Sequence, residues 1–122
     1  MGSRRQEKFS RMIQKELSAI FQRESSSWAL GNIVSVTKVE MSPDLSVAKA
    51  YLSFLKTDTA REAFEALGKH KNEIRKQLGN RIAKSVRKIP EIVLYFDDGA
   101  EHAERMDALF RNLNIPPEDK PN

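Results

Sequence analysis

The stretch from Gly68 to Pro90 limits most strongly what this chain can fold into, because it joins a helical apolar period to an excess of positive charge. Eight of its residues are Lys or Arg, and only Glu73 is acidic. Its apolar side chains recur every three or four residues, at Ile74, Leu78, Ile82, Val86 and Ile89. That period is typical of a helix with one buried face. The stretch predicts a helix over residues 71–87, with Gly79 as a weak point inside it.

The chain begins with a segment that predicts a long amphipathic helix. Residues 4–23 carry apolar side chains at helical spacing, and Ser3 can cap their N-terminus. Three serines at positions 25–27 are expected to end the helix. The single tryptophan, Trp28, belongs to no aromatic cluster, so we expect it to pack in the core rather than to stack on a base.

A β-hairpin is predicted next. Residues 32–41 are rich in β-branched side chains, and residues 47–55 alternate between apolar and polar ones. The turn sequence Ser42-Pro43-Asp44 stands between them, so the two segments should pair in antiparallel fashion. Thr57 or Asp58 is then expected to cap a further helix that ends near Gly68.

The chain after Pro90 predicts a buried strand and a last helix. Residues 92–96 are wholly apolar, so this strand should be central or covered on both faces. Asp97-Asp98-Gly99 predicts a turn, residues 101–113 a helix, and residues 114–122 a flexible tail. Residues 4–113 should therefore form one α+β domain, with helices on one face of a three-stranded sheet.

No combination of residues predicts catalysis, a cofactor or a metal site. The chain has no cysteine, and its two histidines, His70 and His102, lack metal-ligand spacing. Asp97, Asp98 and Glu101 resemble a metal-binding or acid–base group, but turn formation and charge at a helix N-terminus explain them. No apolar run is as long as a membrane span, and no secretory signal precedes the first helix. We therefore expect a cytoplasmic protein that is not an enzyme.

The positive charge is concentrated in the body of the chain. Residues 1–96 carry 18 basic and 10 acidic side chains, whereas those from 97 onward carry 3 and 7. Lys and Arg displace counterions from phosphates and so bind nucleic acid with little sequence preference. The expected RNA contacts in the central stretch are Lys69, Lys71, Arg75, Lys76, Arg81, Lys84, Arg87 and Lys88. A second candidate contact on the first helix comprises Arg4, Lys8, Arg11 and Lys15.

A solvated helix face is the alternative for both groups of cations. For the central stretch, i,i+4 ion pairs cannot account for the charge, because acidic residues are nearly absent from it. The order helix, strand, strand, helix, helix, strand is that of a type II KH-like domain, in which the helix junction holds nucleic-acid backbone, usually through a GXXG loop. This chain has no GXXG sequence, which argues against a protein that grips a free single strand.

Four segments carry a resemblance to a known family. The most specific is the hairpin VEMSPDLSVAKAYLSFL (Val39–Leu55). The others are EKFSRMIQKELSAIFQRE (Glu7–Glu24), IRKQLGNRIAKSVRKIPEI (Ile74–Ile92) and FDDG (Phe96–Gly99). In these segments, and over about residues 4–113, the chain is similar to bacterial ribosome-binding factor A.

The resemblance implies a KH-like fold whose helix junction is a helix–kink–helix, typically Ala-x-Gly, in place of GXXG. It also implies binding to the small ribosomal subunit (30S) and its 16S rRNA during late maturation, a link to growth in the cold, and no catalytic activity. The Ala-x-Gly position falls on His70-Lys71-Asn72, where Asn72 can adopt the positive φ that Gly would supply. We expect a monomer. Two rivals remain: a KH-like RNA chaperone that acts away from ribosomes, and a small α+β enzyme that uses Asp97 and Asp98.

Overall fold

Three α-helices and a mixed sheet make up this computed structural model, which describes residues 3–97 and 103–105. The helices are α1 (Arg4–Trp28), α2 (Ala60–Gly68) and α3 (Lys71–Ile82), and a 3-10 turn, η1 (Thr57–Thr59), precedes α2. The strands are β1 (Val34–Met41), β2 (Val47–Phe54), β3 (Glu91–Asp97) and the short β4 (Ala103–Arg105).

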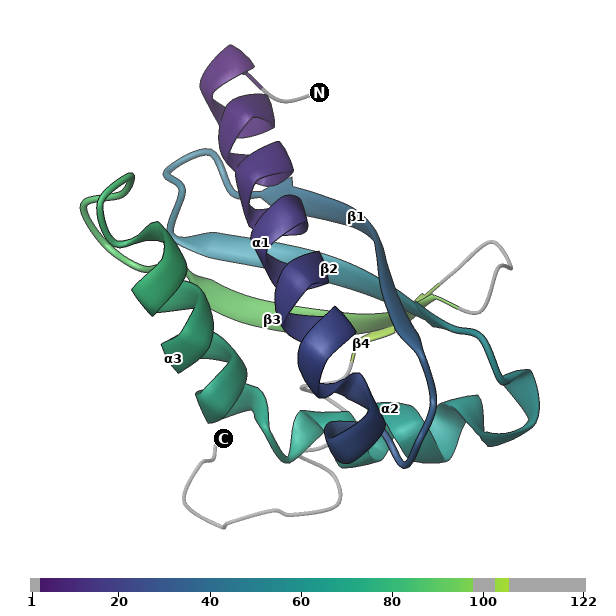
Figure 1. Cartoon of the computed structure of the whole chain (residues 1–122). Coiled ribbons are helices and arrows are strands. Elements are labelled where there is room, and N and C mark those ends of the chain that lie inside the picture. Colours follow the sequence, from purple (N-terminus) through teal and green to yellow (C-terminus); the bar gives the residue numbers. More distant parts are fainter. Residues whose placement is uncertain (1–2, 98–102, 106–122) are drawn as a thin grey trace, which may run out of the picture.

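The sheet has the strand order β1-β2-β3-β4. β1 and β2 form the predicted antiparallel hairpin, and the Ser42 N–H donates to the Val47 carbonyl at its turn, at 2.9 Å. β3 runs parallel to β2, which the crossover through α2 and α3 makes possible. α1 and α3 lie side by side across one face of the sheet (Figure 1). The predicted α+β, KH-like arrangement is confirmed, and β4 adds a short strand antiparallel to β3.

The hydrophobic core fills the space between these helices and the sheet. α3 contributes Ile74, Leu78 and Ile82, as its apolar period predicts, and all three are almost fully buried. On β2 the buried positions alternate and include Ala48 and Ala50, whose small side chains let the helical layer approach closely. Burial of each large aliphatic side chain stabilises the fold by about 1.5–3 kcal/mol, so these two faces fix how the helices sit on the sheet.

The first helix is longer than predicted. The serines at positions 25–27 do not end it, because α1 continues to Trp28. Ser25 is buried and its carbonyl accepts from the Ala29 N–H at 2.7 Å, while Trp28 is buried as expected, with 8% of its surface exposed. At its other end the predicted cap is present: the Ser3 hydroxyl accepts from the Gln6 N–H in a capping box. Tertiary packing thus overrides the weak helix propensity of serine.

Other parts of the prediction also differ from the structure. α3 ends at Ile82 instead of residue 87, and Val86 and Ile89 reach the core from the following loop. α2 begins at Ala60, after η1, without a side-chain cap from Thr57 or Asp58. Residues 103–105 form β4, so the predicted helix over 101–113 is wrong there. The rest of that helix, and the tail over 114–122, lie outside the described residues.

Candidate nucleic-acid interface

The junction between α2 and α3 is held by an aromatic stack. The helices are interrupted at Lys69 and His70, and the His70 ring stacks on the Trp28 ring with their centroids 5.2 Å apart. His70 Nδ1 also lies 3.3 Å from the Ala66 carbonyl oxygen. Asn72 does not supply the positive φ that Gly would supply there: it lies inside α3, and its φ is not positive. The break therefore depends on side-chain packing, not on a glycine-like backbone.

Two of the predicted RNA contacts bind other parts of the protein. Arg75 donates to the carbonyls of Ile89 and Pro90, at 3.1 and 3.3 Å, and so fastens the loop after α3 back onto the helix. Arg81 Nε pairs with Glu16 Oε1 of α1 at 2.6 Å. The acidic partner of Arg81 is therefore supplied by α1 and not by the basic stretch itself. Both arginines therefore have a structural role.

The remaining cations of the stretch differ in exposure and in partners. Lys71 is half-buried and already has an interaction partner. The exposed ones are Lys69, Lys76, Lys84, Arg87 and Lys88. Within residues 3–97, none of these five side chains makes a hydrogen bond or an ion pair. Lys69 precedes α3, Lys76 lies within it, and Lys84, Arg87 and Lys88 follow it in the next loop. The helix between these ends is about 18 Å long.

The four cations of α1 lie on the same side of the molecule. Arg4, Lys8, Arg11 and Lys15 are all exposed, and at about 100° per residue they lie opposite the buried positions of α1. Lys76 is likewise opposite the buried face of α3. Because α1 and α3 cover one face of the sheet (Figure 1), the α1 cations and Lys76 point away from it. We call the outer surface of the helical layer the helical basic face; it comprises these cations together with the exposed Lys69, Lys84, Arg87 and Lys88, which flank α3.

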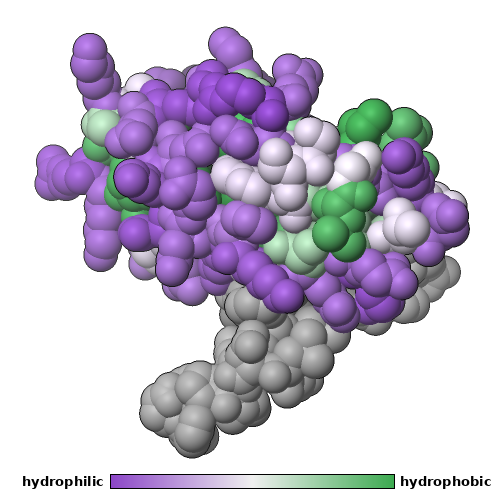
Figure 2. Space-filling model, turned by 60° about the horizontal axis from the view of Figure 1, so that its bottom comes forward, coloured by the Kyte–Doolittle hydropathy of each residue, from purple (hydrophilic) through white to green (hydrophobic). Residues whose placement is uncertain are grey.

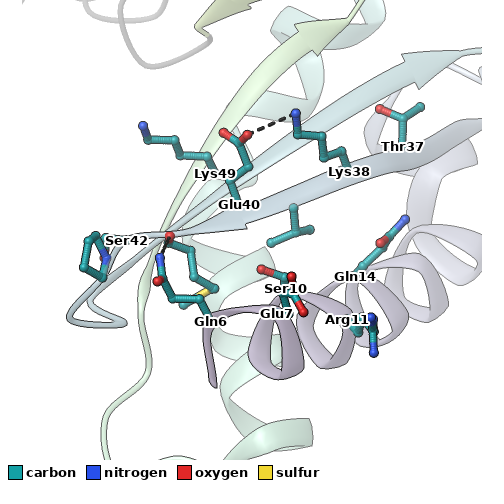
Figure 3. Close-up of a pocket in the computed structure, with 13 residues that line it drawn as sticks. Gln6, Glu7, Ser10, Arg11, Gln14, Thr37, Lys38, Glu40, Ser42 and Lys49 are labelled. Atoms are coloured by element: carbon teal, nitrogen blue, oxygen red, sulfur yellow. Dashed lines mark hydrogen bonds and ion pairs between the residues drawn. The ribbon is translucent and has the colours of Figure 1, made fainter. Parts of the chain in front are cut away.

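A groove of about 680 Å³ follows the free edge of β1 beside α1 (Figure 3). The side-chain amides of Gln6 and Gln14 donate to the Met41 and Val36 carbonyls of this edge strand, at 2.9 and 3.0 Å. The charged residues that line the groove have both signs: Glu7, Arg11, Lys38, Glu40 and Lys49. Three are cationic and two are anionic, and Lys38 pairs with Glu40, so the charge of this groove is close to balanced.

The opposite face of the sheet holds a polar cluster that the sequence reasoning did not use. Tyr51 and Tyr95 stack with their centroids 4.8 Å apart, the Tyr51 hydroxyl donates to Glu40 at 3.1 Å, and Lys38 pairs with Glu40 at 3.0 Å. Burial, together with the Glu40 carboxylate, raises the pKa of Tyr51 to about 12. The hydrogen bond from Lys38 lowers the pKa of Glu40. The alternation along β2 was the signal that could have located this cluster.

Little of the described structure suggests catalysis. The described residues contain no group of three or more His, Cys, Asp or Glu side chains that could hold a metal ion. Asp97 ends β3 and accepts from the Thr37 hydroxyl at 3.2 Å, while Asp98 lies outside the described residues. Among the described helices, none is both long and apolar enough to cross a membrane.

The end of the molecule near α2 has a different character. Its surface is largely hydrophilic, with hydrophobic residues showing mainly at the right of the view and in a smaller area at its left edge (Figure 2). Among the described residues, the most exposed large apolar side chains are Leu30, Ile33 and Leu55, at 63%, 53% and 69%. Ile33 and Leu55 are joined by a backbone hydrogen bond. None of the predicted RNA contacts belongs to this patch.

Comparisons with known proteins agree with the geometry. The family model of ribosome-binding factor A matches residues 5–110. The chain belongs to the ribosome-binding factor A family. It is 44% identical to the family member of Cytophaga hutchinsonii over 123 residues, which covers 100% of this chain and 92% of that one. It is 33% identical to that of Flavobacterium johnsoniae, covering 98% and 93%.

Solved structures of the family share the fold. A solution structure of a Thermotoga maritima protein described as a ribosome binding factor A is 31% identical, with a TM-score of 0.60, covering 84% of this chain and 95% of that one. The crystal structure of ribosome-binding factor A from Thermus thermophilus is 18% identical, with a TM-score of 0.61, covering 73% and 92%. At 18% identity, the similarity to the Thermus thermophilus protein concerns the fold alone. Both structures confirm the KH-like fold.

Proposed function

We propose that this protein is a non-enzymatic assembly factor that binds the immature small ribosomal subunit and its 16S rRNA and assists late maturation. Membership of the ribosome-binding factor A family supports this, as does a Thermus thermophilus homology model of that factor fitted into the electron-microscopy map of a 30S complex. The observation that carries the proposal for this chain is the helical basic face, with its exposed lysines free of acidic partners in the described residues.

The helical basic face would act by shape and charge. Lysines along α3 and α1 neutralise phosphates and release counterions, and the rigid helical layer sets the spacing of phosphates that it accepts. An rRNA conformation that matches this spacing is stabilised, and a mature conformation that does not match favours release of the protein. Arg75 and Arg81 contribute indirectly. Arg75 holds the loop that follows α3 in position, and Arg81 holds α1 against α3.

Two charge-matched triple variants test the proposal by co-sedimentation with immature small subunits. Lys69→Gln, Lys76→Gln and Lys84→Gln remove three charges from the helical basic face. Lys38→Gln, Lys49→Gln and Lys56→Gln remove three from elsewhere on the protein. If each lysine of the first triple contacts one phosphate, the slope of log affinity against log salt should decrease by about 2–3. The second triple should change it by less than half as much. Unchanged binding by the first triple would place the interface elsewhere.

A general RNA chaperone is the second candidate, because cations alone carry no sequence information. Competition decides between the two. Unrelated single-stranded RNA that displaces the protein from subunits at equal phosphate concentration favours the chaperone. An assembly factor should require a large excess of such RNA.

A further inference from the structure

A second groove, of about 500 Å³, lies where three separate segments meet. They are the first turns of α1, the turn between β1 and β2, and the loop after α3 (Figure 1). The rim carries three cations, Arg5, Arg87 and Lys88. In the described part of the chain, neither Arg87 nor Lys88 has a hydrogen-bond or ion-pair partner. The groove is therefore positive, in contrast to the balanced groove along β1.

The one acidic residue at this rim is engaged within its own turn. Asp44 Oδ1 accepts from the Ser42 hydroxyl at 2.8 Å, and from the Ser46 hydroxyl and N–H at 2.7 and 3.1 Å. These hydrogen bonds, those from Ser46 first, lower the pKa of Asp44. Its carboxylate shapes the turn and has no ion-pair partner among the rim cations.

The floor of the groove is apolar. Phe9, Leu45 and Val86 are partly buried and pack against the core, and Leu45 is held at a φ of 62°, a conformation that non-glycine residues seldom adopt. The Arg5 guanidinium lies 5.9 Å from the centroid of the Phe9 ring, at the outer limit of a cation–π contact. An aromatic ring and a planar guanidinium are both surfaces on which a nucleobase can stack.

The groove is built before any ligand binds. Arg75 holds the Ile89 and Pro90 carbonyls, and the Glu91 N–H donates to the Ser46 carbonyl at 2.8 Å, which joins the loop after α3 to the hairpin turn. Arg87 and Lys88 therefore lie on a loop that hydrogen bonds hold against α3 and the hairpin turn. Pre-organisation of this kind lowers the entropic cost of binding, because little of the site has to be ordered when the ligand binds.

We propose that this groove holds one unpaired RNA nucleotide, with its base on the floor formed by Phe9, Leu45 and Val86 and its phosphate at Arg5, Arg87 and Lys88. Its volume is in the range of about 300–1,000 Å³ that small ligands occupy, which suits a single nucleotide and not a duplex. The positive rim favours RNA over a polypeptide. The inference rests on the proposed function, and it adds that the bound rRNA presents an extruded base at this end of the molecule.

Binding of a short single-stranded RNA that contains 2-aminopurine tests the groove directly. Wild-type protein should quench the 2-aminopurine, because the base stacks. Phe9→Leu keeps the apolar volume but removes the aromatic ring, so affinity should fall at least about fivefold, the lower end of what one base–aromatic stack contributes. Phe9→Tyr keeps an aromatic ring, so its affinity should be close to that of the wild type. Met12→Leu, elsewhere on α1, is the matched control. Equal affinity and equal quenching for Phe9→Leu and Met12→Leu would overturn the proposal.

Binding to immature small subunits separates this inference from the proposed function. If wild-type protein binds subunits but Phe9→Leu and the Arg87→Gln, Lys88→Gln double variant bind within twofold of it, the groove is not a nucleotide site although the function stands. If RNA binding depends on Phe9 while subunits are not bound, the function fails and the groove stands. Replacing Ser85, at the rim, by p-benzoylphenylalanine should give crosslinks to 16S rRNA. Crosslinks to a ribosomal protein alone would identify a protein ligand and overturn the proposal.

Discussion

Replacing Arg81 by Gln separates what the central basic stretch does for the fold from what it does for RNA. Arg81 Nε lies 2.6 Å from Glu16 Oε1, and the side chains of the two residues are 35% and 22% exposed. Exposed ion pairs contribute about 0.2–1 kcal/mol, and hydrogen bonds to charged groups about 1.5–3 kcal/mol. Because this pair is partly exposed, we expect Arg81→Gln to lower the free energy of unfolding by about 1 kcal/mol.

The assay is thermal unfolding combined with the salt dependence of subunit binding. A loss of about 1 kcal/mol lowers the Tm of a domain of this size by about 4 °C. Glu16→Gln should have a similar effect, and the double variant should lose little more than either single variant. Binding should keep its salt slope, since Glu16 already neutralises Arg81.

The matched variant is Lys76→Gln, on the exposed side of the same helix. It should leave the Tm within about 1 °C, because surface substitutions change stability by less than about 0.5 kcal/mol, and it should reduce the salt slope by about 0.7–0.9. If Arg81→Gln instead keeps the Tm and reduces the slope as much as Lys76→Gln does, the reasoning is refuted and Arg81 belongs to the RNA contacts.

Three further results are expected. Gly79→Ala should raise the Tm by about 4 °C, because Ala favours a helix interior by about 1 kcal/mol and the new Cβ would meet Ile89 at 3.4 Å, an ordinary contact; a lower Tm would mean that Ile89 cannot yield. His70→Ala should cost about 1 kcal/mol and shift the fluorescence of Trp28, and unchanged emission would contradict the stack. The raised pKa of Tyr51, about 12, means that its stabilising contribution is complete below pH 10 and is lost as the pH rises through 12. In a phenolate absorbance titration, the step that Tyr51→Phe removes should be the late one; removal of a step near pH 10 would contradict the raised pKa.

The sequence predicts the elements well where one periodicity extends through an element. The apolar period of α3 and the alternation of β2 identify their buried faces because each residue's environment there follows from its own element. The helix ends are predicted less well. α1 passes through three serines because Trp28 gains burial against the core and against His70, a contact between residues far apart in the sequence. α3 stops at Ile82 although its apolar period continues, since Val86 and Ile89 can reach the core from a loop.

The sequence predicts which cations are candidates for the interface. It does not predict which of them bind other parts of the protein and which are left exposed to bind RNA. A sequence reveals that acidic residues are nearly absent from the central stretch, yet it cannot reveal that Glu16 of α1 lies against Arg81 or that two carbonyls lie against Arg75. The groove around Phe9 is assembled from three segments, so no local pattern indicated it. Residues 103–105 lie in a segment whose apolar spacing predicts a helix. They form strand β4 because they pair with the edge of β3.

Directed cleavage of rRNA tests the central claim most directly. The chain has no cysteine, so Lys76→Cys provides a single thiol on the helical basic face, and Lys49→Cys provides one on the face of β2 opposite to the helices. Each can carry an iron chelate that cleaves nearby RNA when the protein is bound to immature small subunits. We predict strong cleavage of 16S rRNA at a confined set of positions from residue 76 and weak cleavage from residue 49. Equal cleavage from both, or stronger cleavage from residue 49, would contradict the helical basic face as the RNA-binding surface.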